Sequence, residues 1–146
     1  MRPGYGAPAM YFEDFREGDS APELRHKLTR TDLVRYAGAS GDFNPMHTDE
    51  VTAREAGQPS VFGHGMFTAG YLARAITDFV GAGSLTRYKV RFAKQTWPGE
   101  TLVTGVRVSW RQEEEATIGL ECTVTNQDGE VKLMGEAAAT LARRAG

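Results

Sequence analysis

The chain has 146 residues, of which 40% are hydrophobic and 25% charged, and its formal net charge is −2. These values are ordinary for a globular protein, and the length suits one domain over residues 1–146. The pI of about 5.9 argues against nucleic acid as a partner, because phosphate binding needs a basic surface. No apolar run of about 18 residues is present, so we expect no membrane-spanning helix and no membrane partner.

Cys122 is the only cysteine, so no disulfide can form within the chain. It falls on the apolar side of an expected strand, which predicts a buried and inert thiol. The first ten residues, MRPGYGAPAM, lack the apolar core of a signal peptide, and we expect residues 1–10 to form a loose arm. Together these features predict a cytoplasmic protein.

Helix signals begin at Thr29, which forms a capping-box spacing with Asp32. The helix that follows is expected to end at Gly38 and Gly41. Thr48 is expected to cap a second short helix, because acidic residues directly follow it and suit the positive end of the helix dipole. The longest helix candidate runs from residue 65 to residue 80 and is apolar nearly all round, which predicts a buried helix.

The hydrophobic period changes from about 3.6 to 2 over the last part of the chain, which predicts strands. A short strand is also possible over residues 23–28. The later strands are expected at Thr86–Lys94, Thr101–Arg111, Thr117–Thr125 and Glu130–Leu141. Consecutive strands with short connections predict an antiparallel meander with one apolar face, on which Trp110 is placed. The predicted fold class is therefore α+β, with a curved antiparallel sheet around one buried helix, and the exposed sheet edge predicts a dimer.

Acid–base chemistry is suggested by Asp42 and His47, which lie five positions apart. Between them, Pro45 pushes Asn44 out of the helical region, so the two side chains are expected on a bent loop rather than on one helix face. Downstream, Gly65 stands at the start of the long helix, where free backbone N–H groups can stabilise developing negative charge.

These residues carry a resemblance to a known family. The motif Tyr36-Ala-x-x-Ser40-Gly-Asp42-Phe-Asn44-Pro-Met-His47-x-Asp49, followed by His64-Gly65-Met66, resembles the hydratase motif of MaoC-like dehydratases over roughly residues 20–142. That family includes (R)-specific enoyl-CoA hydratases and (3R)-hydroxyacyl thioester dehydratases. The resemblance implies a single hot-dog domain, in which a curved sheet wraps a long central helix. It also implies reversible syn hydration of a trans-2-enoyl thioester of coenzyme A or a carrier protein, in fatty-acid or related metabolism.

The resemblance implies a role for each motif residue. Asp42 and His47 correspond to the catalytic pair, and the backbone amide of Gly65 to the group that stabilises the thioester oxygen. The expected supporting residues are Ser40, Asn44, Pro45 and His64. Pro45 fixes the bend, and His64 either holds the helix entry by a hydrogen bond or contacts the substrate. Some relatives carry a serine further along the central helix, and Ala73 stands at that position here.

Neither a metal nor a cofactor is expected, because the family uses none and the chain has no HxH or HExxH spacing. His26 carries no functional signal. Basic residues gather on the polar side of the first long strand and its end, namely Arg87, Lys89, Arg91 and Lys94. They are either a solvated face or contacts for the phosphates of the substrate carrier.

Two further functions stay open. A non-catalytic acyl-thioester-binding or assembly subunit could keep the fold, although it would have no chemical need for both Asp42 and His47. A hot-dog thioesterase would place a carboxylate on the central helix, where Asp78 near the far end is the first acidic residue. The expected assembly is a homodimer, with a heterodimer of related hot-dog subunits as the alternative.

Overall fold

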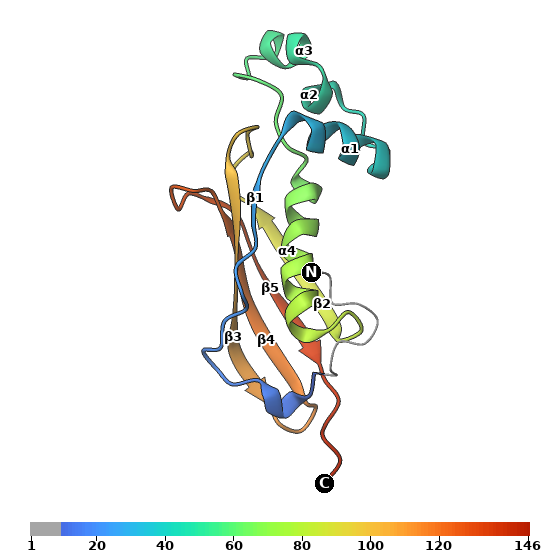
Figure 1. Ribbon diagram of the computed structural model, residues 1–146, viewed down its shortest axis with the longest axis vertical. Coiled ribbons are helices and arrows are strands. Elements are labelled where there is room, and N and C mark those ends of the chain that lie inside the picture. Colours follow the sequence, from blue (N-terminus) through green and yellow to red (C-terminus); the bar gives the residue numbers. More distant parts are fainter. Residues whose placement is uncertain (1–9) are drawn as a thin grey trace.

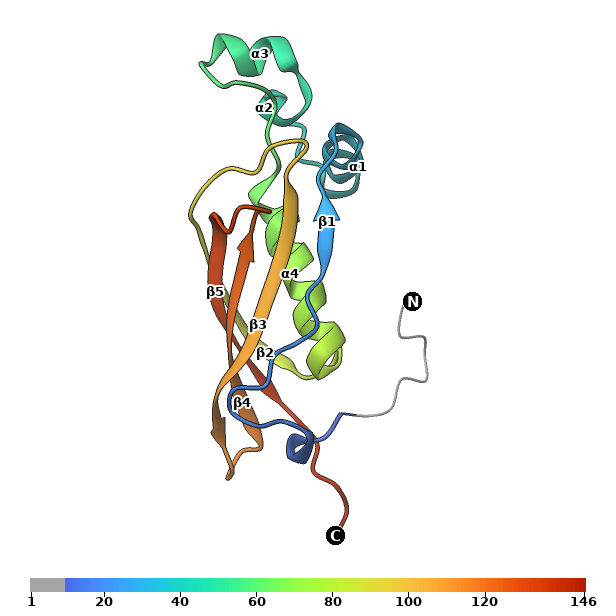
Figure 2. The ribbon, with the colours of Figure 1, turned by 60° about the vertical axis from the view of Figure 1, so that its left-hand side comes forward.

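The structure, a computed structural model, describes residues 10–146, and a five-stranded antiparallel sheet is its largest element (Figure 1). The strands are β1 (Arg25–Lys27), β2 (Leu85–Phe92), β3 (Thr101–Gln112), β4 (Thr117–Thr125) and β5 (Val131–Thr140). They lie in the order β1-β3-β4-β5-β2, and the sheet curves around one long helix, α4 (Gly65–Val80) (Figures 1 and 2). The α+β hot-dog layout is therefore confirmed.

The helices before α4 lie beyond one end of the sheet, around the start of α4 (Figure 1). After the short 3₁₀ helix η1 (Phe12–Asp14), they are α1 (Arg30–Ser40), α2 (Pro45–Thr48) and α3 (Glu50–Glu55). Thr29 caps α1 with the predicted capping box, and Gly41 ends it at a φ of 76°, whereas Gly38 lies inside the helix. The prediction that Thr48 caps the next helix is wrong. Thr48 ends α2, a single helical turn where the sequence predicted a loop. The Asp49 carboxylate caps α3.

Helix α4 has the predicted bounds and ends at Gly81, whose φ is 94°. One face, which includes Leu72 and Ile76, is fully buried against the sheet. The prediction of burial all round is wrong for this single chain, because Met66 is 61% exposed on the opposite side. The helix therefore presents an uncovered face to whatever packs beside it.

The predicted meander holds for β3, β4 and β5 but fails for β2. Strand β2 pairs with β5 at the far edge of the sheet, with Phe92 opposite Leu133, instead of pairing with β3. Residues 93–100 cross the end of the sheet to reach β3. Backbone N–H groups of Ala93 and Lys94 donate to the carbonyl of Lys132, which holds the start of this crossing beside β5.

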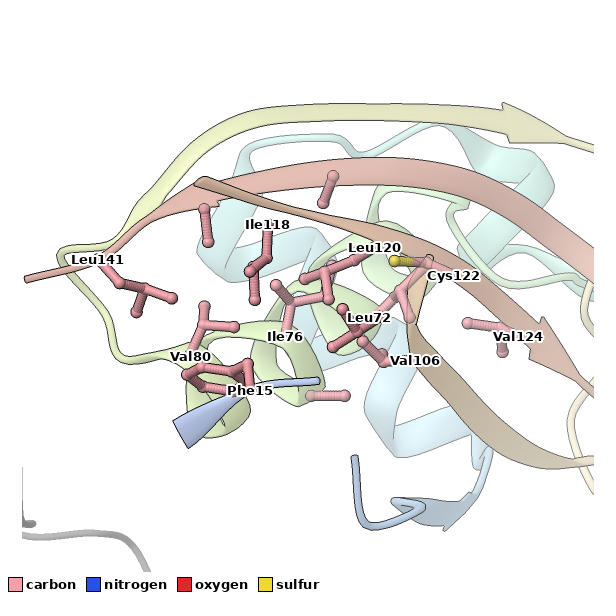
Figure 3. Packing of buried hydrophobic residues seen from close by; sticks show 14 of the residues in the cluster. Phe15, Leu72, Ile76, Val80, Val106, Ile118, Leu120, Cys122, Val124 and Leu141 are labelled. Atoms are coloured by element: carbon pink, nitrogen blue, oxygen red, sulfur yellow. The ribbon is translucent and has the colours of Figure 1, made fainter. Parts of the chain in front are cut away.

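The core lies between α4 and the concave face of the sheet (Figure 3). Side chains of Ile118, Leu120, Cys122 and Val124 all point into it, as their alternation predicts. Burial raises the pKa of the Cys122 thiol to about 12, so the thiol stays protonated and inert, as expected.

Trp110 does not share the core face of β3, contrary to the prediction. The pairing register shifts between Val108 and Trp110, and this bulge turns Trp110 to the outer face, where it is 45% exposed. The ring covers Gly119 so closely that a Cβ there would lie 2.0 Å from it. Of the arm predicted over residues 1–10, all but Met10 lies outside the described residues. Among the described helices, none is long and apolar enough to cross a membrane.

We expect Leu72→Ala to lower the free energy of unfolding by about 2–5 kcal/mol, because it leaves a cavity between α4 and the sheet. Arg74→Ala on the exposed side of the same helix is the matched control, and its exposed pair with Asp78 is worth at most about 1 kcal/mol. Urea denaturation of the two variants compares these costs. Equal costs would contradict the packing of α4 on the sheet.

Candidate active site

The loop between α1 and α2 is held by a relay of local hydrogen bonds. The backbone N–H of Asp42 donates to Ser40 Oγ at 3.1 Å, and the N–H of Asn44 donates to Asp42 Oδ1 at 3.2 Å. The N–H of Met46 then donates to Asn44 Oδ1 at 3.0 Å, and Pro45 opens α2. Short polar side chains bonded to the backbone two residues on produce tight turns, which explains why this sequence bends here.

His47 is buried, and its ring is fixed by one short hydrogen bond. Nδ1 lies 2.6 Å from the carbonyl oxygen of Phe62. A carbonyl oxygen only accepts hydrogen bonds, so Nδ1 carries the proton. In the neutral ring, Nε2 is then the basic nitrogen, and it faces the carboxylate of Asp42.

Asp42 Oδ2 lies 3.9 Å from His47 Nε2, which is too long for a direct hydrogen bond. A water oxygen about 2.8 Å from each atom fits this separation. The Asp42 side chain is 51% exposed, so water reaches it freely. The arrangement can therefore hold one water molecule between a base and a carboxylate.

His64 connects the start of α4 to this pair. Its Nε2–H donates to the backbone carbonyl of Asp42 at 3.0 Å, and its ring stacks on the His47 ring with centroids 3.9 Å apart. Burial holds the pKa of His64 below its ordinary value, and the nearby His47 acts in the same direction. A neutral His64 thus supports the loop that carries Asp42, which agrees with the helix-entry role that the sequence suggests.

Gly65 is the first residue of α4, where backbone N–H groups have no partner within the helix. A Cβ on Gly65 would lie 2.8 Å from the Phe92 ring, so the glycine lets this aromatic ring close over the helix start. Gly65, His47 and Phe92 line one cavity of about 370 Å³. The cavity thus places a basic nitrogen and a helix N-terminus around the same space.

Several features of the site carry no signal in the sequence. Phe62 acts through its carbonyl, and a backbone acceptor is the same for any residue type. Thr68 and Thr96 line the cavity and are buried, with hydroxyl oxygens that have no hydrogen-bond partner among the described residues. Ala73, in contrast, is not among the described residues that line the cavity.

Asp42, His47 and His64 also lie close enough for a metal to be considered, since one ligand atom of each falls within 4.8 Å of the others. The two imidazole planes are stacked at 26°. A ring nitrogen binds a metal in the plane of its ring, and stacked rings direct their lone pairs side by side rather than at one point. The geometry does not suit an ion, and the expectation of no metal stays a prediction.

A known protein family matches most of this chain. The family model for the MaoC-like domain matches residues 16–129. The chain belongs to the MaoC-like dehydratase family. This match covers the whole motif that the sequence analysis singled out, from Tyr36 to Met66.

Individual relatives of this chain differ in length. An (R)-specific enoyl-CoA hydratase from Rhodospirillum rubrum is 31% identical over 92% of this chain and 93% of its own length. The 3-hydroxyacyl-thioester dehydratase Y of Mycobacterium tuberculosis is 35% identical over 78% of this chain, but this chain spans only 43% of that protein. Among solved structures, an R-hydratase from Pseudomonas aeruginosa superimposes with a TM-score of 0.82 at 24% identity, covering 93% of this chain and 88% of that chain, which shows the fold.

The pKa of His64 gives a prediction for stability. A histidine whose folded-state pKa lies below its unfolded value contributes stability above about pH 6.5, and this contribution is lost as the pH falls. We therefore expect the melting temperature of the wild type to fall more between pH 7 and 5 than that of His64→Gln, since glutamine cannot take up a proton. Scanning calorimetry at several pH values checks this. If the melting temperatures of the wild type and His64→Gln changed equally with pH, burial would not be what holds His64 neutral.

Proposed function

We propose that this chain catalyses the reversible hydration of trans-2-enoyl thioesters to (3R)-hydroxyacyl thioesters and is therefore a hydro-lyase. The observation that carries the proposal is that His47 Nε2 faces Asp42 Oδ2 across a gap of 3.9 Å, which fits one water molecule, and that His47 and Gly65 line the same cavity. Its relatives named (R)-specific enoyl-CoA hydratase and 3-hydroxyacyl-thioester dehydratase support the same reaction. No cofactor is needed, because only water and a proton are exchanged.

His47 and Asp42 are the proposed catalytic residues. Nε2 of His47 takes a proton from the water held between the two side chains, and the water oxygen bonds to C3 of the substrate. Electrons of the C2–C3 double bond move toward the thioester, and C2 then receives a proton from the same pair of residues. Delivery from one side of the substrate gives syn addition, and the reverse sequence removes water.

Gly65 is the proposed site for the thioester oxygen. This oxygen becomes negative in the enolate, and the free N–H at the start of α4 together with the helix dipole stabilises it there. Ser40, Asn44, Pro45 and His64 support the reaction through the loop contacts described above.

The remaining proposals concern assembly and location. Apolar side chains near the cavity are unusually exposed, with Phe43 at 66%, Met66 at 61% and Phe92 at 54%. Covering them favours a homodimer of this single domain, or a heterodimer with a related hot-dog subunit. A single buried cysteine supports a cytoplasmic location.

The thioester carrier is coenzyme A or a carrier protein. Lys94 lines the cavity but is paired with Glu130 at 2.9 Å, and Arg87 is paired with Glu136 at 3.5 Å. We therefore propose Lys89 and Arg91, rather than Lys94 and Arg87, as the basic residues around β2 that contact the phosphates of the carrier. The thioesterase alternative is weakened because Asp78 lies in the last turn of α4, at the end opposite Gly65.

We expect Asp42→Asn and His47→Gln each to lower kcat for crotonyl-CoA hydration by at least about 100-fold, because each removes a group that transfers or holds the proton. His26→Gln, a histidine bonded to Asp32 outside the cavity, is the control and should keep its activity. Loss of the enoyl absorbance gives the rate, and chiral analysis should find the (3R) product. A stable wild type without activity on any chain length would favour the binding or assembly subunit.

We expect Gly65→Ala to lower kcat/KM by about 10- to 100-fold, because the new methyl group displaces the Phe92 ring at the mouth of the cavity. The double variant Gly65→Ala/Phe92→Ala removes this clash. The single Gly65→Ala variant and the double variant both keep the backbone N–H of residue 65. In this double-mutant cycle, we expect Gly65→Ala to lower kcat/KM less in the Phe92→Ala background than in the wild type. No coupling between the two positions would contradict the contact.

A further inference from the structure

A buried lysine lies beside the cavity without a role in the reaction proposed above. Lys132 in β5 is only 2% exposed, although lysine is rarely buried unless it is paired. In the pairing with β4, Val131 lies opposite Thr125 and Leu133 opposite Val124, so Lys132 is the extra residue of a bulge. A bulge redirects a side chain, and Lys132 accordingly lines the cavity instead of facing solvent.

All three N–H donors of the Lys132 ammonium are occupied. Nζ contacts Glu130 Oε1 at 2.6 Å, Glu100 Oε2 at 2.9 Å and the carbonyl of Gln95 at 3.0 Å. Burial alone would lower the pKa of Lys132, but its hydrogen bonds to Glu130 and Glu100 outweigh burial and hold the pKa above its ordinary value. The group is charged and has no donor left for a substrate, so its contacts act on the protein itself.

These contacts fix the segment of residues 93–100 between β2 and β3. Glu100 accepts a second hydrogen bond from the backbone N–H of Trp97 at 2.7 Å, and a third from Asn126 Nδ2 at 2.8 Å. Lys132 thus holds the segment directly at Gln95 and, through Glu100, at Trp97. The Lys132 side chain is therefore one of the contacts that hold the middle of this crossing in place.

The same segment supports the backbone that orients His47. Gly63 N–H donates to the carbonyl of Thr96 at 2.8 Å, and a Cβ on Gly63 would lie 2.2 Å from the Thr96 hydroxyl, so the two stretches are in direct contact. The Trp97 ring meets the Phe62 ring edge-on at 5.8 Å. Phe62 carries the carbonyl that binds His47 Nδ1. Each step from Lys132 to His47 is thus a hydrogen bond or a direct side-chain contact.

We propose that Lys132 is a positioning residue, which sets the position of the Phe62 carbonyl through residues 95–97 and so fixes the orientation and tautomer of His47. This inference rests on the proposed hydratase function for its kinetic consequence, but the effect on the His47 ring does not depend on it. Its physical basis is that a misplacement of about 1 Å at a reacting group can lower a rate by about 100-fold.

The test compares two variants that both lose stability. Lys132→Met keeps an unbranched side chain that is one atom shorter and removes its charge. Ile118→Ala creates a cavity in the core at the start of β4, where Ile118 pairs with Ala139, away from the end of β4 that pairs with Val131. Hydration of trans-2-enoyl-CoA by both proteins, below the melting temperature of each, gives kcat, KM and the pH profile of kcat/KM.

For Lys132→Met we expect kcat to fall by about 10- to 100-fold and KM to change less than about threefold. The low-pH limb of the profile, where protonation of the His47 base abolishes activity, should also move. Ile118→Ala should retain kcat and the wild-type profile despite its lower melting temperature. The proposal is overturned if Lys132→Met keeps the wild-type kcat and profile, or if Ile118→Ala loses as much activity.

A second readout separates this proposal from the proposed function. The chain has three histidines, so long-range ¹H–¹⁵N spectra of the imidazoles can be assigned with His26→Gln and His47→Gln. We expect the wild type to hold His47 in the Nδ1–H form and Lys132→Met to show a mixture of tautomers. If the wild type hydrates no enoyl thioester but these spectra differ, the function fails and the positioning stands. Identical spectra overturn the positioning.

Glu100→Gln replaces Lys132→Met if that protein does not fold. Glutamine keeps an oxygen for the Trp97 N–H, and Lys132 keeps its pair with Glu130. The amide nitrogen that replaces Oε2 removes the charge pair with Lys132 and the hydrogen bond from Asn126. We expect a change of the same sign in kcat and in the His47 spectrum, but smaller. An unchanged spectrum in this folded variant likewise counts against the proposal.

Discussion

The site depends on one hydrogen bond, from Nδ1–H of His47 to the backbone carbonyl of Phe62. An imidazole can act as a base only at the nitrogen that lacks a proton, and this bond decides that the nitrogen is Nε2. The carboxylate of Asp42 faces the same nitrogen from a separate loop. If the Phe62 carbonyl moved, the His47 ring would lose the hydrogen bond that defines its orientation and its tautomer.

Three parts of the fold meet at this bond. Helix α2 brings His47, the stretch before α4 brings the Phe62 carbonyl, and the crossing between β2 and β3 contacts that stretch at Thr96. His64 closes the arrangement by bonding α4 to the backbone of Asp42. A sheet curved around one helix provides this geometry because the N-terminus of the helix, the end of β2 and the crossing all reach the same end of the sheet (Figure 2).

Much of this could be predicted from the sequence, since local patterns determine it. The capping box at Thr29, the bounds of α4 and the alternation in β4 are short-range signals, and the Asp42–His47 motif is contiguous. The cap predicted at Thr48 is a local error of one residue, because Asp49 caps α3. The larger failures depend on pairing between distant residues. The place of β2 beside β5, the bulge that exposes Trp110 and the bulge that buries Lys132 are set by strand register, which no single stretch of sequence encodes. The sequence does not reveal Phe62, because its backbone carbonyl and not its side chain binds His47.

The most direct test of the account is a crystal structure of the Asp42→Asn variant with crotonyl-CoA bound. The account predicts the thioester oxygen within hydrogen-bond distance of the Gly65 N–H, and C3 of the acyl group beside the water position that His47 Nε2 and residue 42 share. His47 should keep its bond to Phe62 in that complex. An acyl group bound away from His47, or an oxygen that does not reach the start of α4, would contradict it.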